Sequence, residues 1–270
     1  MPKRERELLG VFVGDLHCGS PTAPAPRGKI ESTAGEWVSE TFQTFVAETL
    51  ALMATRRTVI FLGGDLVDGS RHHGTYESWG TPKEQRDAAI GLLLPLTSKA
   101  AAVYGLIGTE AHAGPKGDDD RTVAEELGAK SAEHTWHLTL GGQRLDWAHH
   151  GVSVPRDPTN EDSGMLAEAR RQYQGWLKRL AFKAEFPDTP DVMPKPDLVV
   201  RHHAHFSPRP VNRLGITVAV CPCWQLSNSF GYKIGPERVP SIGALYWHPE
   251  RGAVERKLYP VERSYAEVKV

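Results

Sequence analysis

The sequence lacks a long apolar run and any excess of charge of one sign. No apolar run in its 270 residues approaches the roughly 20 residues that span a bilayer. No signal-peptide-like apolar segment follows the charged start, so we expect a cytoplasmic protein with no membrane partner. A formal net charge of −1 excludes a global field that attracts nucleic acid, although a local basic surface is compatible with it.

Cysteine is also scarce, because the chain has only Cys18, Cys221 and Cys223. Three cysteines are too few for a disulfide framework, and we expect reduced thiols. The apolar fraction of 40 % is ordinary for a soluble globular protein that buries a sizeable core. No repeat or convincing linker divides the chain, so we expect one domain over residues 1–270.

Histidine, in contrast, is concentrated in short segments, most of which directly follow strand-like runs. Seven of the twelve histidines lie in four of five such segments. These segments are Asp15-Leu16-His17, the turn Gly108 to His112, His149-His150 and His202-His203-Ala204-His205, with Gly64-Asp65-Leu66-Val67-Asp68 as a purely acidic member. Imidazole and carboxylate together are the ligands that a pair of divalent metals needs.

The first half of the chain alternates strands with helices. Residues 8–13, 58–62 and 102–107 are predicted strands, and residues 36–56 and 83–101 show helical spacing. This alternation predicts an α/β fold with parallel strands. Acidic residues or histidines stand at the carboxyl end of each strand, which is the edge where open α/β sheets form their sites.

The second half delivers the remaining histidines. Predicted strands 135–140 and 143–147 form a hairpin through Gly141-Gly142, and the second of them ends at His149 and His150. After a helix over 163–183, a strand at 197–200 leads to the His202–His205 segment. The remaining strand-like stretches, at 215–220, 243–247 and 253–258, look antiparallel.

The residue pattern suits two metals. We expect Asp15 and His17 to lie on extended backbone and to point to one side, as do His203 and His205. Asp65 can bridge both ions, because a carboxylate has two oxygens. Such a pair of ions clamps a phosphoryl group and activates a water for attack on phosphorus.

The ligand count assigns Asp15, His17, Asp65 and one of the last histidines to the first ion. The second ion takes Asp65, His150, the other last histidine and a group from the Gly108–His112 turn. These mixed oxygen and nitrogen donors favour manganese, with iron, zinc or nickel as alternatives. His112 is the candidate acid that protonates the leaving group.

In this order, the motifs resemble the calcineurin-like metallophosphoesterase superfamily, whose pattern is D-x-H, G-D-x-x-D, G-N-H-[DE], a later H beside Gly, and G-H-x-H. The resemblance spans roughly residues 8 to 206. It implies an α/β fold of two mixed β-sheets packed as a sandwich and flanked by helices. On this basis we expect the chain from about 207 to 270 to complete the second sheet.

Three positions leave choices open within that resemblance. Gly108-Thr109-Glu110-Ala111-His112 replaces G-N-H-[DE], so the usual Asn ligand is missing. Glu110 is our first choice to replace it, and the Thr109 hydroxyl is the second. The family pattern favours His150 over His149. Strand alternation pairs His203, rather than His202, with His205. This form of the third motif resembles phage and bacterial phosphoesterases, which implies a host cytoplasm if the chain is phage-encoded.

Three further assignments concern residues around the predicted ligands. Asp68 is expected to orient a metal-binding histidine or the loop, rather than to bind metal. His72 and His73 are candidates for substrate contact, although a solvated loop is the default for such residues. The Asp118-Asp119-Asp120 run is expected to be the solvated start of a helix.

The function that follows is metal-dependent hydrolysis of a phosphoester. A phosphodiesterase or nuclease is our first hypothesis, with DNA or a nucleotide as substrate, because the nucleases of the superfamily share this frame. A phosphomonoesterase acting on protein or small molecules is the alternative. Gly69 weakens only its protein-phosphatase form, because protein phosphatases of the family carry Arg there. A non-catalytic metal-binding scaffold is the third hypothesis, because the third motif departs from the pattern.

Overall fold

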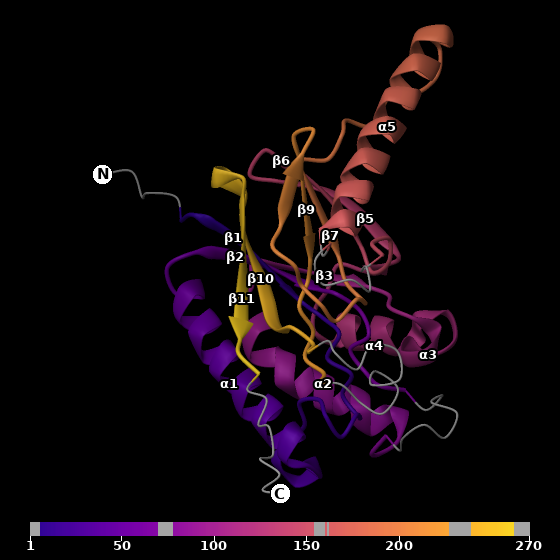
Figure 1. Ribbon diagram of the computed structural model, residues 1–270. Helices are drawn as coiled ribbons and strands as arrows, with labels where there is room; N and C mark the ends of the chain where they lie inside the picture. Colours follow the sequence, from indigo (N-terminus) through magenta and orange to yellow (C-terminus); the bar gives the residue numbers. More distant parts are fainter. Residues whose placement is uncertain (1–5, 70–77, 154–159, 161, 227–238, 262–270) are drawn as a thin grey trace, which may run out of the picture.

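Two mixed β-sheets form the centre of the molecule, and helices flank them (Figure 1). The computed structural model describes residues 6–69, 78–153, 160, 162–226 and 239–261. The described helices are α1 (Thr33–Met53), α2 (Pro82–Thr97), α3 (Glu110–Ala113), α4 (Asp118–Glu126) and α5 (Ser163–Glu185). The predicted α/β class with two mixed sheets and flanking helices is confirmed.

The first sheet has the order β11-β10-β1-β2-β3-β4. Its strands are β1 (Leu8–Val13), β2 (Arg57–Leu62), β3 (Ala102–Leu106), β4 (Ala132–Glu133), β10 (Ile242–His248) and β11 (Ala253–Tyr259). β1 to β4 are parallel, whereas β10 pairs antiparallel with β1 and β11 pairs antiparallel with β10. The parallel half therefore places the ends of β1, β2 and β3 at one edge.

The second sheet has the order β5-β6-β7-β9-β8. Its strands are β5 (Thr135–Leu140), β6 (Gln143–Ala148), β7 (Leu198–Arg201), β8 (Val211–Arg213) and β9 (Ile216–Val220). β5 and β6 form the predicted hairpin, and β6, β7 and β9 run parallel. From the sequence we expect residues after about 207 to complete this sheet. Instead they are divided, because β8 and β9 join it while β10 and β11 return to the first sheet.

Side-chain alternation along the strands explains the layers. In β1, Val11 and Val13 pack toward α1 and α2, whereas Phe12 packs into the space between the sheets. In β7, Val200 faces the same space, and Val199 packs against the first turns of α5. Strands buried on both faces read as continuous apolar runs. The resulting order of layers is helices, sheet, sheet, helix.

The helices begin at recognisable caps. The Ser32 side chain accepts a hydrogen bond from the Gly35 N–H and starts α1, so this helix begins three residues before the predicted 36. Thr81 and Glu84 form a capping box at α2. The far half of α5 extends beyond the body of the molecule (Figure 1). In the described parts of the chain, no helix combines the length and apolar character needed to cross a membrane.

Candidate metal centre

Five loops bring the predicted site together at the carboxyl ends of strands from both sheets. Asp15 follows β1, Asp65 follows β2, Thr109 follows β3, His149 follows β6 and His202 follows β7. The loops are tied to one another by backbone hydrogen bonds, including Asp15 N to Gly64 O (2.9 Å) and His202 N to His149 O (3.0 Å). Segments nearly 200 residues apart in the sequence therefore share one site.

The backbone at these positions is left-handed, which corrects the expected extended conformation. The φ angles are +49° at Asp15, +48° at His17, +47° at Asp65, +67° at His203 and +55° at His205. Positive φ is uncommon outside glycine, costs about 1–3 kcal/mol per residue and persists where the surroundings impose it, often at functional sites. Tight turns, not strand alternation, aim these side chains into the site.

Asp15, Asp65 and His149 form the buried centre of the site. The His149 Nε2 lies 3.3 Å from Asp15 Oδ1 and also 3.3 Å from Asp65 Oδ2. All three side chains are buried. One imidazole nitrogen thus stands between two carboxylates that come from neighbouring strands.

A second group surrounds His17. Its Nε2 lies 3.0 Å from the Nε2 of His205, and its Nδ1 lies 3.5 Å from Asp68 Oδ1. The His205 Nε2 is also 3.6 Å from Asp15 Oδ1. Asp15, His17 and His205 therefore present ligand atoms close enough to share one cation. The placement of Asp68 behind His17 suits the orienting role expected for it.

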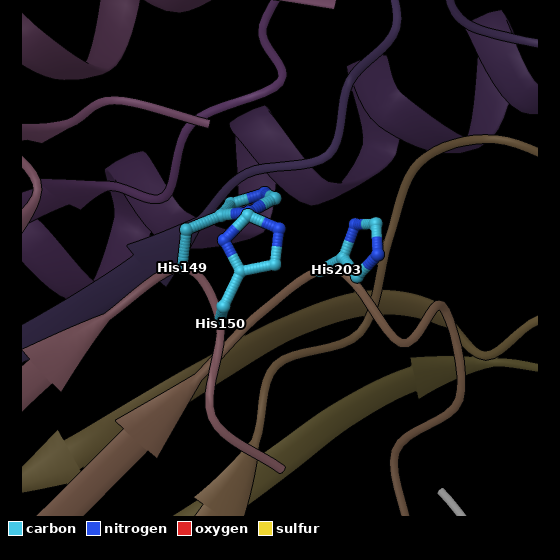
Figure 2. Close-up of side chains that lie close together, drawn as sticks. All are labelled: His149, His150 and His203. Atoms are coloured by element: carbon cyan, nitrogen blue, oxygen red, sulfur yellow. The ribbon is translucent and has the colours of Figure 1, made fainter. Parts of the chain in front are cut away.

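A third group opens towards solvent. His149, His150 and His203 lie together, with His150 and His203 exposed (Figure 2). The ring centroids of His150 and His203 are 4.6 Å apart, and the His203 Nδ1 is 3.9 Å from Asp65 Oδ2. Asp65 therefore stands near both His149 and His203.

The charges of this centre are coupled. Burial by itself raises the pKa of Asp15, but the adjacent imidazoles of His149, His202 and His205 hold that pKa well below its usual range. The pKa of Asp65 is lowered in spite of burial, chiefly by His149 and His203. Burial opposes the charging of His149, yet the carboxylates of Asp65 and Asp15 raise its pKa to about 9. The carboxylates thus require positive charge beside them.

The turn after β3 presents Thr109, and not Glu110, to the centre. The Thr109 N–H donates to Asp65 Oδ1 at 2.7 Å, and its hydroxyl lies 3.0 and 3.1 Å from the two oxygens of the same carboxylate. Glu110 is exposed at the start of α3 and is absent from the metal-compatible groups found among the described residues. The turn therefore orients Asp65 through Thr109.

His112 stands at the edge of the His17 group. Its Nδ1 lies 2.8 Å from the backbone oxygen of Asp68. A carbonyl can only accept, so Nδ1 carries the proton and Nε2 is left for chemistry. Burial and the neighbouring His17 lower the pKa of His112 to about 4. Its ring centroid is 4.4 Å from that of His17.

His202 lies where the family pattern has Gly, and it is buried between Trp147 and Asp15. The Trp147 Nε1–H donates to His202 Nε2 at 3.0 Å, and His202 Nδ1 lies 3.4 Å from Asp15 Oδ2. Indole is only a donor, so the proton of the neutral His202 ring resides on Nδ1, facing Asp15. The ring fits because position 63 is glycine: a Cβ there would be 2.0 Å from His202 Cε1.

The acidic run before α4 differs from its predicted role. We expect Asp118, Asp119 and Asp120 to be solvated, but only Asp118 is exposed, while Asp119 pairs with Arg86 and Asp120 is completely buried. Asp120 accepts hydrogen bonds from the two loops that carry Asp65 and Thr109. The sequence run itself does not distinguish its third member from the first.

Several buried imidazole nitrogens in the described chain have no hydrogen-bond partner. Those at the site are His17 Nδ1, both ring nitrogens of His149 and His202 Nδ1. Unpartnered buried polar atoms are costly and are rarely retained without a reason. Imidazole nitrogens and carboxylate oxygens at these separations fit divalent transition metals such as manganese, iron, zinc or nickel. His72 and His73 lie outside the described residues.

Comparison with known proteins gives similarities of fold at low identity. No family model matches the chain, and neither does any curated protein. Solved structures that it resembles include an archaeal phosphodiesterase (7 % identity, 93 % of this chain and 99 % of that one, TM-score 0.44) and the E. coli phosphoesterase YfcE (15 %, 88 % and 87 %, 0.42). A third is zinc-complexed Vps29 from Entamoeba histolytica (13 %, 93 % and 98 %, 0.40).

The structure itself shows the two mixed β-sheets with flanking helices that were expected from the sequence. Each of the five motifs stands at the carboxyl end of a strand, and the order of the strands in the two sheets brings these ends together. The similarities to solved structures concern the fold and assign no activity to this chain. A fold does not by itself determine function, because the chemistry depends on the residues present at the site.

Proposed function

We propose that this protein hydrolyses phosphoester bonds with two divalent metal ions, and that its substrate is a phosphodiester such as DNA or a nucleotide. The observation that supports the proposal is the position of Asp65. Its carboxylate lies between the Asp15–His149 pair and His203, with the Thr109 hydroxyl fixing both oxygens. That arrangement suits a carboxylate shared by two ions.

The residues divide into two ligand sets around Asp65. Asp15, His17 and His205 would hold one ion, and His149 or His150 with His203 would hold the other. When bound, such a pair of ions supplies an activated water and offsets negative charge on phosphoryl oxygens. Manganese is our proposed metal, with iron, zinc and nickel as alternatives.

Two further residues act beside the ligands: Asp68 orients an imidazole, and His112 transfers a proton. Asp68 lies behind His17 and favours the tautomer that leaves His17 Nε2 directed inward. The Asp68 backbone oxygen fixes His112, so its Nε2 can donate a proton to the leaving oxygen once that nitrogen is protonated. A bound anionic ester favours this protonation, because negative charge near an imidazole raises its pKa.

Position 69 argues against a protein phosphatase, and a diester remains our preferred substrate. A phosphomonoester carries an additional negative charge, which protein phosphatases of the family offset with an Arg after the second motif. Here Gly69 has φ +76°, and a Cβ at this position would lie 2.7 Å from the Ala111 backbone oxygen. The tight turn therefore excludes an arginine side chain at that place in this chain.

The proposal is tested by turnover of bis-p-nitrophenyl phosphate, p-nitrophenyl phosphate, and plasmid or single-stranded DNA with Mn²⁺. Asp65→Asn is the inactive variant, and Asp118→Asn, at an exposed carboxylate, is the matched control that keeps activity. We expect turnover of the diester and DNA only. Turnover of the monoester alone would establish a phosphatase, and metal binding without any turnover would establish a scaffold.

A further inference from the structure

Asp120 is a buried acid in a run whose first member is exposed. It is the third residue of α4 and has no exposed surface, whereas the Asp118 side chain is 65 % exposed. Burying a carboxylate is expensive unless hydrogen bonds compensate it. The partners of Asp120 therefore explain why an acid occupies this position.

Those partners are three backbone amides from two separate loops. Asp120 Oδ2 accepts from the N–H of Asp65 (3.0 Å) and from the N–H of Gly108 (2.8 Å). Its other oxygen accepts from the N–H of Leu66 (2.9 Å). One carboxylate thus connects the loop after β2 to the loop after β3.

The two loops approach each other closely at two glycines. A Cβ on Gly64 would be 2.7 Å from the Gly108 nitrogen, and a Cβ on Gly108 would be 2.1 Å from Asp65 Oδ1. Both loops lie beyond the ends of β2 and β3, so β-sheet hydrogen bonding supplies no acceptors for the amides of Asp65, Leu66 and Gly108. Buried N–H groups need a partner, and Asp120 supplies it.

We propose that Asp120 is a positioning residue that sets the affinity of the site for metal without touching the metal. The Thr109 N–H and hydroxyl reach Asp65 only if the two loops keep this register. The same register places Asp65 Oδ2 3.3 Å from His149 Nε2. The inference rests on the proposed function, because it requires a metal at Asp65.

Asp120→Asn is the direct test. The amide keeps one acceptor oxygen for the amides of Asp65 and Gly108, but its NH₂ group then faces the N–H of Leu66, donor against donor. We expect Mn²⁺ affinity, measured by calorimetry on folded protein, to fall by about 10–100-fold, as for other residues that orient ligands. Hydrogen exchange at the three amides, followed by NMR, should accelerate.

Two matched variants separate positioning from general stability. Asp118→Asn changes an exposed acid of the same run and should leave Mn²⁺ affinity unchanged. Val123→Ala removes buried apolar volume from the same helix and should lower the melting temperature while the folded protein keeps its affinity. A merely structural Asp120 would behave like Val123 in this comparison.

The outcomes separate this inference from the function on which it rests. If folded Asp120→Asn binds Mn²⁺ like the wild type, the inference is overturned. If the wild type itself binds no Mn²⁺, Zn²⁺, Fe²⁺ or Ni²⁺, the proposed function fails instead. If the variant does not fold, amide hydrogen exchange in the metal-free wild type is the deciding measurement. Protection of the Asp65, Leu66 and Gly108 amides supports the inference, and free exchange of these amides overturns it.

Discussion

At the residue scale, the choice between His149 and His150 depends on burial. The family pattern favours His150, yet His149 is the buried imidazole, with its Nε2 equidistant from Asp15 and Asp65. His150 is exposed and lies beside His203. Neighbouring histidines at the end of one strand are hard to distinguish from sequence, because one residue of register exchanges their environments.

The structure favours His149 as the stronger contributor to metal binding. We expect His149→Asn to weaken Mn²⁺ affinity by at least about tenfold, and more than His150→Asn does. Its removal would leave Asp15 and Asp65 facing each other without the positive partner that lowers their pKa values. Calorimetry on the two variants in parallel is the measurement, and the reverse order would restore His150 as the principal ligand.

His112 is expected to act on turnover and not on metal content. His112→Asn should lower kcat by about 10²–10⁴-fold, the usual contribution of a general acid. Elemental analysis of the purified variant should give the same metal content as the wild type. Loss of metal from this variant would show that His112 is a ligand, as its contact with His17 and Asp68 also allows.

At the element scale, Arg201 connects three elements beneath the site. It is the last residue of β7 and is buried, and its Nη2 lies 2.5 Å from Asp146 Oδ1 in β6 and 2.8 Å from Glu168 Oε1 in α5. His202 follows it directly. The base of the projecting α5 is therefore attached to the strand end that presents the last histidines.

Glu168→Gln tests this attachment. Breaking one partner of a buried ion pair costs about 3–5 kcal/mol, and we expect somewhat less here because Asp146 still pairs with Arg201. Burial raises the pKa of Glu168, but Arg171 and Arg201 lower it below its ordinary 4.5. The advantage of the wild type should therefore be complete above pH 4.5 and disappear as pH falls through the lowered pKa.

Urea unfolding of both proteins over this pH range measures the difference. Glu185→Gln, at the exposed end of the same helix, is the control and should match the wild type throughout. A constant difference between wild type and Glu168→Gln at all pH values would show that the ionised carboxylate is not what stabilises α5 on the sheet.

Elements were easier to predict from the sequence than the geometry between them. Apolar runs located β1 and β2 with errors of at most one residue, because buried strands need continuous apolar character. The left-handed turns at Asp15 and His205 have no sequence signal, since neither residue is glycine. Asp120 was beyond prediction because its burial depends on two loops that meet only in the folded chain.

At the scale of the whole molecule, a cluster of acids and imidazoles at the meeting point of two sheets should respond to metal. A ligand that binds only the folded state stabilises it by about 2.7 kcal/mol at 100 times its Kd. For a chain of this size we expect the melting temperature to rise by about 5–10 °C at that concentration of Mn²⁺. Asp65→Asn should show a much smaller rise, and equal rises in both proteins would place the metal elsewhere.

The central claim is that the five loops enclose two ions with Asp65 between them. An anomalous difference map of a crystal grown with Mn²⁺ tests it most directly. We predict two peaks: one against Asp15, His17 and His205, and the other against His149 or His150 and His203, with Asp65 touching both. A single peak, or peaks away from Asp65, would contradict the account.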